Sequence, residues 1–328
     1  MIDAATLAAE FAALPDPVKV ALGYALKPMV GDLKAIPTFI AKRVMRQSEV
    51  GTVARLEAAK ELGKLVAAEA MTDPEYVEAT KQALLPTEIA RIANRAGVAA
   101  EAILAASAEH TREAAKEPDT NSATESRNPE TPDDDWMMAF MRHAEDASST
   151  ELRSLFGRIL SGQISRPGSF TRATLRAVAD MDQAIANDFI WFWGHCIGDG
   201  APSTMLSGPG IEWARLSRLR DAGLVSYVES GIWQPNVEPM EGLGYPWRLG
   251  FDDVGLLLFF KDYSRRHINI FGLTSTGKQI SQIVDHPDKK AALMKLATSY
   301  MNEDVNRVDL FEAGKQTQML WINQPTTV

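Results

Sequence analysis

The sequence predicts a mainly α-helical protein with a small α+β module, similar to a winged helix, in its C-terminal third. Apolar residues recur at the spacing of amphipathic helices over residues 4–116 and again over 135–196. Beyond residue 210, a helical run is followed by short segments rich in β-branched and aromatic residues, and then by a further helix. This order of helix, strands and helix indicates the winged-helix-like module.

A chain of 328 residues is longer than one hydrophobic core normally supports, so we expect several folding units. One stretch has almost no apolar side chain to offset the entropy of ordering, which predicts an acidic, flexible linker. The predicted parts are a helical N-terminal region (1–115), that linker (116–134), a helical domain (135–200), the winged-helix-like module (201–285) and a C-terminal helix with its tail (286–328).

The charge of the chain argues against a dedicated nucleic-acid binder. Acidic residues outnumber basic ones by 43 to 34, a net charge of -9, whereas such proteins carry a clustered excess of Lys and Arg. The net charge does not exclude a local basic surface on one part of the protein. Cys196 is the only cysteine, which excludes an intramolecular disulfide and a Cys-rich zinc site and is typical of a reducing compartment. We therefore expect a cytoplasmic protein.

Residues 18–44 are the most membrane-like part of the sequence, but charged residues interrupt them, as do Pro28 and Pro37. The segment therefore falls short of the roughly 20 apolar residues that a spanning helix needs. We expect no transmembrane segment and interpret these residues as a packed pair of helices. Contact of the N-terminal helices with a membrane surface is the alternative.

The N-terminal region is expected to hold four or five helices, with Pro86 and Gly97 among their boundaries. The run IANRAGV at 92–98 has the spacing of a bacterial repressor helix-turn-helix, in which Gly97 forms the turn. The residues that follow offer alanines, Glu101 and Glu109 rather than side chains that bind phosphates and bases. Two packed helices joined at Gly97 are therefore favoured over DNA readout.

Local signals predict the elements after the linker. The acidic residues 133–135 suit a helix N-terminus, and Ser149 suits the cap of the next helix. Residues 182–196 form another helix, whose aromatic side chains cover all its sides and predict a buried central helix. Beyond it we expect a helix at 210–223, a hairpin at 224–235, strands at 255–260 and 267–273, a helix from 275, a helix at 287–302 and an edge strand near 318–323.

The segment from Gly272 to Gln279 has the P-loop spacing G-x-x-x-x-G-K and lies between a predicted strand and a predicted helix. Gln279 stands where a Ser or Thr would bind magnesium, and too few residues follow to build the parallel sheet of such a fold. A turn between strand and helix is therefore favoured over nucleotide binding.

No residue is predicted to be catalytic or to bind a metal or a cofactor. The five histidines are scattered, and none lies at metal-ligand spacing from another His, Cys or carboxylate. His195 and Cys196 are adjacent on a predicted helix, where neighbouring side chains diverge by about 100°, so they do not imply a catalytic dyad. Nothing in the sequence marks an enzyme.

The run ELRSLFGRILSGQI at 151–164, followed by PGSFT at 167–171 and by Thr174-Leu175, resembles a known signature. It is that of a bacterial family of uncharacterised proteins, the domain of unknown function 2806. Ala173 replaces the arginine expected before Thr174, and the resemblance extends over residues 85–290. The run is more distantly similar to proteins of the abortive-infection alpha type, which are associated with phage defence. The resemblance implies a fold and a bacterial context but no catalytic residues.

The signature residues have packing roles, in which Gly157 permits a close approach of helices and Gly162 ends its helix. Exposed arginines are the exceptions, and they are the places where an anionic partner would bind. They are Arg153, Arg158, Arg166 and Arg172. In the winged-helix-like module, the helix in the recognition position carries Arg215, Arg218 and Arg220, flanked by Glu212 and Asp221.

The leading hypothesis is a non-enzymatic interaction or regulatory protein that forms homo-oligomers, binds an unidentified protein partner and acts in bacterial anti-phage defence. The alternative is a winged-helix DNA-binding protein that uses Arg215, Arg218 and Arg220. A weaker alternative is nucleotide binding through the imperfect P-loop.

Overall fold

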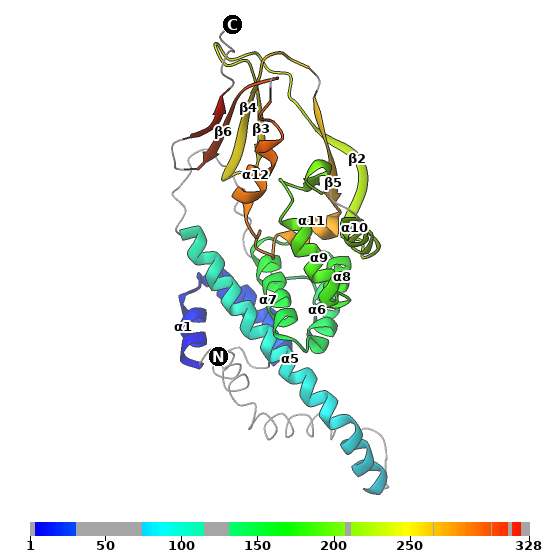
Figure 1. Cartoon of the computed structure of the whole chain (residues 1–328). Coiled ribbons are helices and arrows are strands. Elements are labelled where there is room, and N and C mark those ends of the chain that lie inside the picture. Colours follow the sequence, from blue (N-terminus) through cyan, green and yellow to red (C-terminus); the bar gives the residue numbers. More distant parts are fainter. Residues whose placement is uncertain are drawn as a thin grey trace. The chain divides into compact units, whose positions relative to one another are not determined.

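The computed structural model describes residues 4–30, 74–114, 131–206, 211–264, 266–302, 304–313 and 317–322 (Figure 1). The chain divides into two compact units, residues 1–180 and 181–328. In the described residues, the first unit consists of helices, and the second combines helices with two small antiparallel sheets. The prediction of a mainly helical protein with β structure in its C-terminal part is confirmed. Most of the predicted linker (116–134) lies outside the described residues.

The first unit is organised around one long helix, α5 (Pro74–Ala114). The other described helices are α1 (Ala4–Ala13), α2 (Asp16–Val30), α6 (Asp134–Asp146), α7 (Thr150–Ser165) and α8 (Arg172–Ala179). Helix α5 packs most extensively on α7 and also contacts α1, α2 and α6 (Figure 1). Its buried face is rich in alanine, and such short side chains let neighbouring helices approach closely.

Helix α5 runs through Pro86 and Gly97 without a break, so the predicted boundaries at these residues are wrong. The helix-turn-helix interpretation of 92–98, with a turn at Gly97, is wrong for the same reason. Pro86 removes one backbone hydrogen bond, a loss that the tertiary contacts of the helix outweigh. Gly97 serves packing, because a Cβ atom there would lie 2.6 Å from Cδ of Arg153.

The helix starts predicted at residues 133–135 and at Ser149 are confirmed. Asp133, Ser149 and Thr171 each accept a hydrogen bond from the backbone N–H three residues later. Gly162 was expected to end its helix, but it lies inside α7. A Cβ atom at Gly162 would lie 2.8 Å from Cε2 of Phe170, so this glycine makes room for an aromatic ring rather than for a turn.

No helix in the described part of the chain is long and apolar enough to span a bilayer. Of the membrane-like segment predicted at 18–44, residues 18–30 belong to α2, which packs on α5. Residues 31–44 lie outside the described part.

The second unit begins with helix α9 (Gln183–Trp193). Phe189 and Phe192 are buried, but Ile190 is 46% exposed, so the helix keeps a solvent-facing side. The prediction that α9 is buried all round is therefore wrong. Its aromatic side chains point to several sides of the helix, but the described neighbouring elements cover only part of it.

The smaller sheet of the second unit has three antiparallel strands in the order β1-β5-β2. These are β1 (Gly200–Pro202), β2 (Val225–Trp233) and β5 (His267–Leu273), and η2 (Ser203–Leu206) and α10 (Ile211–Asp221) lie between β1 and β2. The hairpin predicted at 224–235 is wrong, because this segment is one strand paired with β5. The pairing of β2 with β5 has an irregularity of register between Ser226 and Ser230.

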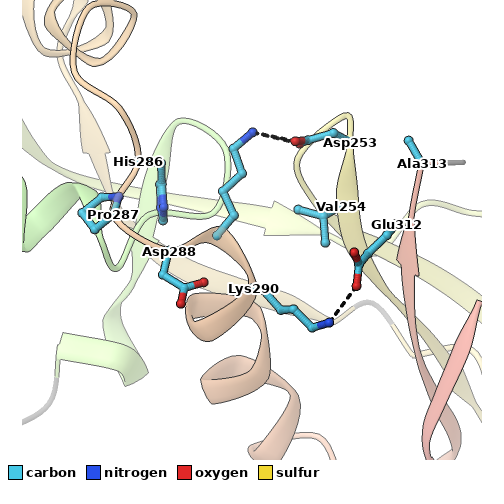
Figure 2. A pocket seen from close by; sticks show the side chains of 9 residues that line it. Asp253, Val254, His286, Pro287, Asp288, Lys290, Glu312 and Ala313 are labelled. Carbon is cyan, nitrogen blue, oxygen red and sulfur yellow. Dashed lines mark hydrogen bonds and ion pairs between the residues drawn. The ribbon is translucent and has the colours of Figure 1, made fainter. Parts of the chain in front are cut away.

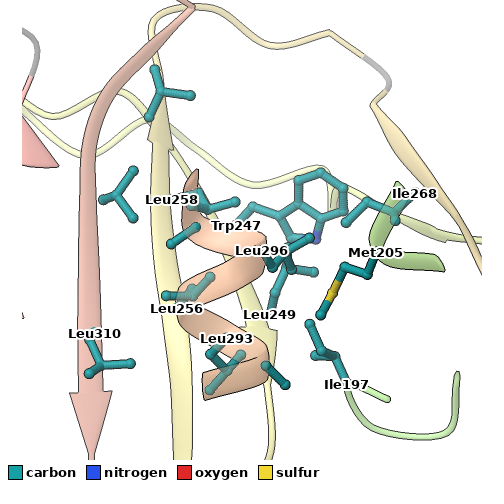
Figure 3. Close-up of a cluster of buried hydrophobic side chains, with 14 of the residues drawn as sticks. Ile197, Met205, Trp247, Leu249, Leu256, Leu258, Ile268, Leu293, Leu296 and Leu310 are labelled. Carbon is teal, nitrogen blue, oxygen red and sulfur yellow. The ribbon is translucent and has the colours of Figure 1, made fainter. Parts of the chain in front are cut away.

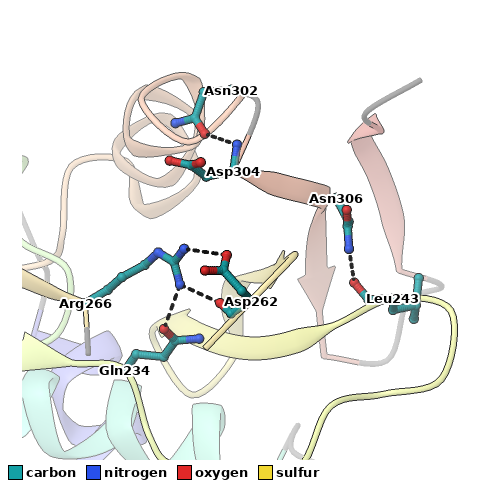
Figure 4. Close-up of polar contacts among 7 residues, drawn as sticks. All are labelled: Gln234, Leu243, Asp262, Arg266, Asn302, Asp304 and Asn306. Carbon is teal, nitrogen blue, oxygen red and sulfur yellow. Dashed lines mark hydrogen bonds and ion pairs between the residues drawn. The ribbon is translucent and has the colours of Figure 1, made fainter. Parts of the chain in front are cut away.

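The chain between β2 and β5 forms an insertion, residues 234–266, whose two ends are joined. The backbone N–H of Gln234 donates to the carbonyl oxygen of Arg266 over 2.9 Å, and Arg266 Nη1 donates to Gln234 Oε1 over 3.3 Å (Figure 4). The insertion contains β3 (Tyr245–Gly250) and β4 (Val254–Phe260), which belong to the second sheet.

The second sheet has the antiparallel order β3-β4-β6-β7, completed by β6 (Val305–Glu312) and β7 (Gln318–Ile322). Helix α12 (Lys289–Thr298) packs on it, and Leu293 and Leu296 of that helix join Trp247 in a buried apolar cluster (Figure 3). The predicted edge strand near the C-terminus is confirmed as β7, and a short helix, α11 (Ser275–Ser281), follows β5. Strands β3 and β6 were not predicted.

Candidate functional site

Arg153, the first predicted partner-binding arginine, is used inside the first unit. Its Nε donates to the carbonyl oxygen of Ala147 over 3.0 Å, and its Nη2 donates to Oδ1 of Asn94 over 2.9 Å. Asn94 is buried, and its Nδ2 donates to the carbonyl oxygen of Glu145 over 2.7 Å. These bonds tie α5 to the end of α6 and the start of α7, so Arg153 holds helices together.

We expect Arg153→Met to lower the free energy of unfolding by about 1 kcal/mol, because the buried Oδ1 of Asn94 loses its donor. Chemical denaturation of the full chain measures the loss. Arg172→Met is the matched control, since Arg172 is exposed at the first position of α8, and it should leave stability unchanged. Equal stability of the two variants would contradict a structural role for Arg153.

The other signature arginines do not join Arg153 in one cluster. Arg166 Nη2 lies 3.6 Å from Oε1 of Glu109, a carboxylate that also accepts a hydrogen bond from Ser165 Oγ over 3.2 Å. Glu109 lies fifteen positions after Asn94 on α5, which separates the two anchoring points by roughly 22 Å along the helix axis. Arg158 is partly buried on α7, whereas Arg172 is exposed. The structure therefore does not gather the four arginines into one basic face.

In the second unit, two of the three α10 arginines bind one buried carboxylate. Asp188 of α9 has only 6% of its side chain exposed, and its Oδ2 accepts a hydrogen bond from Arg218 Nε over 2.7 Å. Arg215 Nε lies 3.6 Å from the other carboxylate oxygen. The hydrogen bond to Asp188 raises the pKa of Arg218 above its ordinary value. Arg215 and Arg218 thus connect α10 to α9.

The remaining surface of α10 is mixed in character. Arg220 is exposed and pairs with its neighbour Asp221 at 3.2 Å. Trp213 is 60% exposed and contacts Phe271 of β5 edge to face, while the Arg215 guanidinium lies 5.1 Å from the ring centre of Trp191. An exposed tryptophan beside internally paired arginines is more typical of a protein-binding surface than of a phosphate-binding one.

Three residues of the P-loop-like segment have local structural roles. Thr274 caps α11 by accepting a hydrogen bond from the backbone N–H of Gly277, and Lys278 Nζ donates to Oδ2 of Asp199 over 2.6 Å. A Cβ atom at Gly277 would collide with the carbonyl oxygen of Leu224. The segment joins an antiparallel strand to a helix of seven residues, unlike the parallel sheet and long helix of a P-loop fold.

A pocket of about 460 Å³ lies at the N-terminus of α12 (Figure 2). Lys289 Nζ donates to both carboxylate oxygens of Asp253 at 2.8 and 3.0 Å, and Lys290 Nζ donates to Glu312 Oε1 over 2.7 Å. Burial alone would raise the pKa of Asp253, but the bond and charge of Lys289, with backbone amides, lower it below its ordinary value. Both lysines of the pocket wall are therefore engaged by carboxylates.

His286 also lines this pocket, and its ring lies between two aromatic side chains. The ring centres of Trp193 and Phe251 are each 5.0 Å from that of His286, in edge-to-face contact, and Nε2 lies 3.3 Å from the carbonyl oxygen of Cys196. Burial and, to a smaller extent, the charge of Lys289 lower the pKa of His286 below its ordinary value of 6.5.

We expect His286 to make the second unit less stable as the pH falls from about 7.5 to 5.5. Because its pKa is lower in the folded state, the unfolded state binds more protons in this window, and stability is lost as the pH drops through the ordinary pKa. The loss should stay below about 1 kcal/mol, because the ring is only half buried. Denaturation across this pH range should show a flatter stability profile for His286→Gln than for the wild type, and an equally steep profile would contradict a role for His286.

His195 and Cys196 do not form a catalytic dyad in this geometry. His195 Nδ1 lies 2.8 Å from the carbonyl oxygen of Trp191, and Cys196 Sγ donates to the carbonyl oxygen of Phe192. The thiol is buried, and this burial raises its pKa well above the ordinary value. A protonated, inaccessible thiol cannot act as a nucleophile at neutral pH.

Sequence reasoning missed three residues on which these sites depend: Asn94, Asp188 and His286. Each is a polar residue within or next to an apolar segment, and that is the one signal that marked it in the sequence. Its partner lies at least 27 positions away along the chain, so periodicity does not reveal the pairing.

The fold and these contacts define the protein as a mainly helical protein with a second α+β unit, in which several of the predicted arginines join helices. Residues 96–196 match the family model described as protein of unknown function, DUF2806, which confirms the resemblance seen in the sequence. The match ends at residue 196, so the expected extension to residue 290 lies outside it. No curated protein and no solved structure matches the chain.

Proposed function

We propose that this protein is a non-enzymatic interaction protein that self-associates and binds a partner protein through a winged-helix-like module. The single observation that carries the proposal is which side chains of α10 are paired within the chain and which are exposed. Two of its three arginines are engaged by the buried Asp188, while Trp213 on the same helix is 60% exposed. Tryptophan is enriched at the centre of protein interfaces, where it buries a large apolar area.

The strand order supports a winged-helix-like module at 201–285. Such a module pairs its first strand with its third and its third with its second, and β1, β5 and β2 are arranged in this way. Helix α10 directly precedes β2, which is the position of the recognition helix. The insertion 234–266 takes the place of the wing loop, and its joined ends let β2 and β5 pair across it.

DNA binding by the same helix is the rival function. Binding to phosphates requires cations that are free to leave their intramolecular partners, and Asp188 competes for Arg215 and Arg218. The net charge of -9 also opposes approach to a polyanion. Arg220, which is exposed and pairs with the exposed Asp221, is the α10 cation best placed to contact DNA.

Light scattering on the purified full chain, with and without duplex DNA of mixed sequence and at two salt concentrations, distinguishes the two functions. The proposal expects a homo-oligomer whose mass does not change with DNA. A mass shift on DNA that high salt abolishes, and that Arg220→Gln reduces, would establish the rival, because phosphate contacts release counterions.

The partner-binding role of α10 is tested by affinity purification of the wild type, Trp213→Ala and Tyr263→Ala from native cells. Tyr263 is an exposed aromatic residue in the insertion and serves as the matched control. A partner retained by the wild type and by Tyr263→Ala but lost with Trp213→Ala supports the proposal. Equal recovery with all three proteins contradicts a role for Trp213.

For the biological setting, we propose an anti-phage response in the bacterial cytoplasm. The similarity of ELRSLFGRIL at 151–160 to abortive-infection proteins and the buried single cysteine support this setting. Cells that express the chain, or lack it, are challenged with a broad phage panel. Reduced plaque formation supports the role, and unchanged infection across the panel contradicts it.

A further inference from the structure

The two edge strands of the second sheet differ in how they are protected. Strand β3, at one edge, contains Pro246, which has no backbone N–H, and the exposed cation Arg248. Proline and exposed cations are the devices by which natural proteins prevent the pairing of a sheet edge with another chain. Strand β7, at the other edge, has the sequence QMLWI and contains neither.

Strand β7 also exposes apolar side chains. Met319 is 51% exposed and Ile322 is 48% exposed, while Leu320 and Trp321 pack against the buried cluster of the sheet. Among the described residues, the neighbour of β7 in the sheet is β6 alone, so the backbone groups directed away from β6 have no strand partner there. An apolar edge strand without a blocking residue is a template for strand addition.

We propose that β7 pairs with β7 of a second copy of this chain in an antiparallel, two-fold symmetric arrangement. This inference rests on the proposed self-association and names its surface. The two four-stranded sheets then join across the symmetry axis into one continuous sheet.

A second copy is the occupant that the chemistry of β7 favours. An antiparallel strand pair is self-complementary, because each strand offers the same alternation of N–H and C=O groups to the other. The chain carries a net charge of -9, so two copies repel each other at long range. Strand β7 has no charged side chain and is free of this repulsion.

The contact is short, and its strength follows from its length. Five residues of strand and two half-exposed apolar side chains bury far less than the roughly 800 Å² per partner of a stable interface. We therefore expect a reversible dimer whose population rises with concentration. Its mass should move from monomer toward dimer between about 1 and 100 µM.

The test is sedimentation equilibrium of the full chain over this concentration range. The variant Met319→Lys/Ile322→Lys places cations of both copies near the two-fold axis and should weaken dimerisation by roughly tenfold or more. Met240→Lys is the matched control, because Met240 is 49% exposed and belongs to the insertion rather than to β7. Thermal unfolding of each variant verifies that the sheet is intact.

A second measurement does not depend on lysine substitutions. Because Cys196 is buried, Gln318→Cys or Met319→Cys provides a single accessible thiol at an exposed position of β7. Oxidation by copper phenanthroline should give disulfide-linked dimers from at least one of these variants, and a cysteine at Met240 should not give them.

The possible outcomes distinguish the proposed β7 contact from self-association in general. A dimer weakened by the β7 lysines but not by Met240→Lys, together with cross-linking at β7, supports the proposal. A dimer that the β7 lysines leave unchanged overturns this surface while self-association stands. A chain that is monomeric at every concentration overturns both, and recovery of a different protein cross-linked at β7 in cells replaces the second copy as occupant.

Discussion

Asp188→Ala is expected to lower the free energy of unfolding by about 2 to 3 kcal/mol. The carboxylate is nearly fully buried and receives a 2.7 Å hydrogen bond from Arg218. Hydrogen bonds to charged groups contribute about 1.5 to 3 kcal/mol each. Arg215 and Arg218 are partly exposed and recover some hydration when Asp188 is absent, which keeps the loss at the lower end of the range for a broken buried ion pair.

Urea denaturation of the full chain, followed by tryptophan fluorescence, measures this loss. Asp221→Ala is the matched control, since Asp221 is an acidic residue of α10 that forms an exposed pair with Arg220. Exposed pairs contribute little, so this variant should unfold at the wild-type midpoint. A loss of the same size in both variants would show that Asp188 is not the anchor of α10.

Gly157→Ala is expected to destabilise the first unit by about 2 kcal/mol. The added Cβ would lie 2.5 Å from Cβ of Glu101 and 2.7 Å from the backbone N of Ala102, so α7 and α5 must move apart. Overpacking of this kind costs about 3 kcal/mol when backbone atoms are in the way. The higher helix propensity of alanine offsets about 1 kcal/mol of that loss.

Thermal and chemical unfolding of the variant provide the measurement, and Gly194→Ala is its control. The backbone at Gly194 is also helical, but a Cβ there would have its nearest neighbours at 3.5 Å, an ordinary contact distance. This variant should be as stable as the wild type or slightly more stable. If Gly157→Ala behaved in the same way, the close approach of α5 and α7 would not depend on that glycine.

Features that depend on short-range interactions were predicted from the sequence. The helix starts at Asp133 and Ser149 are examples, because the hydrogen bond that caps each helix reaches only three residues along the chain. Strand β4 was predicted for a similar reason, since GLLLFF is apolar enough to be buried on both faces. The family resemblance of the helical signature region was likewise visible in the residues themselves.

Features that depend on distant partners were not predicted. Strand β6 was not predicted, because its sheet partner β4 lies fifty positions earlier in the chain, as the pair Leu258 and Val308 shows. Strand β2 looked like half of a local hairpin, but its partner β5 follows the whole insertion 234–266. The arginines of α10 looked free because Asp188 lies 27 and 30 positions before them.

The glycines show most clearly which features the sequence determines and which depend on the tertiary structure. The sequence by itself determined the helical character of the chain, the helix starts and the glycine that permits close packing at position 157. Only the tertiary structure decided that Gly97 and Gly162 accommodate Arg153 and Phe170 rather than turns. A glycine lowers the cost both of a turn and of a close contact, and which of the two it serves depends on the side chain that another part of the chain brings to it.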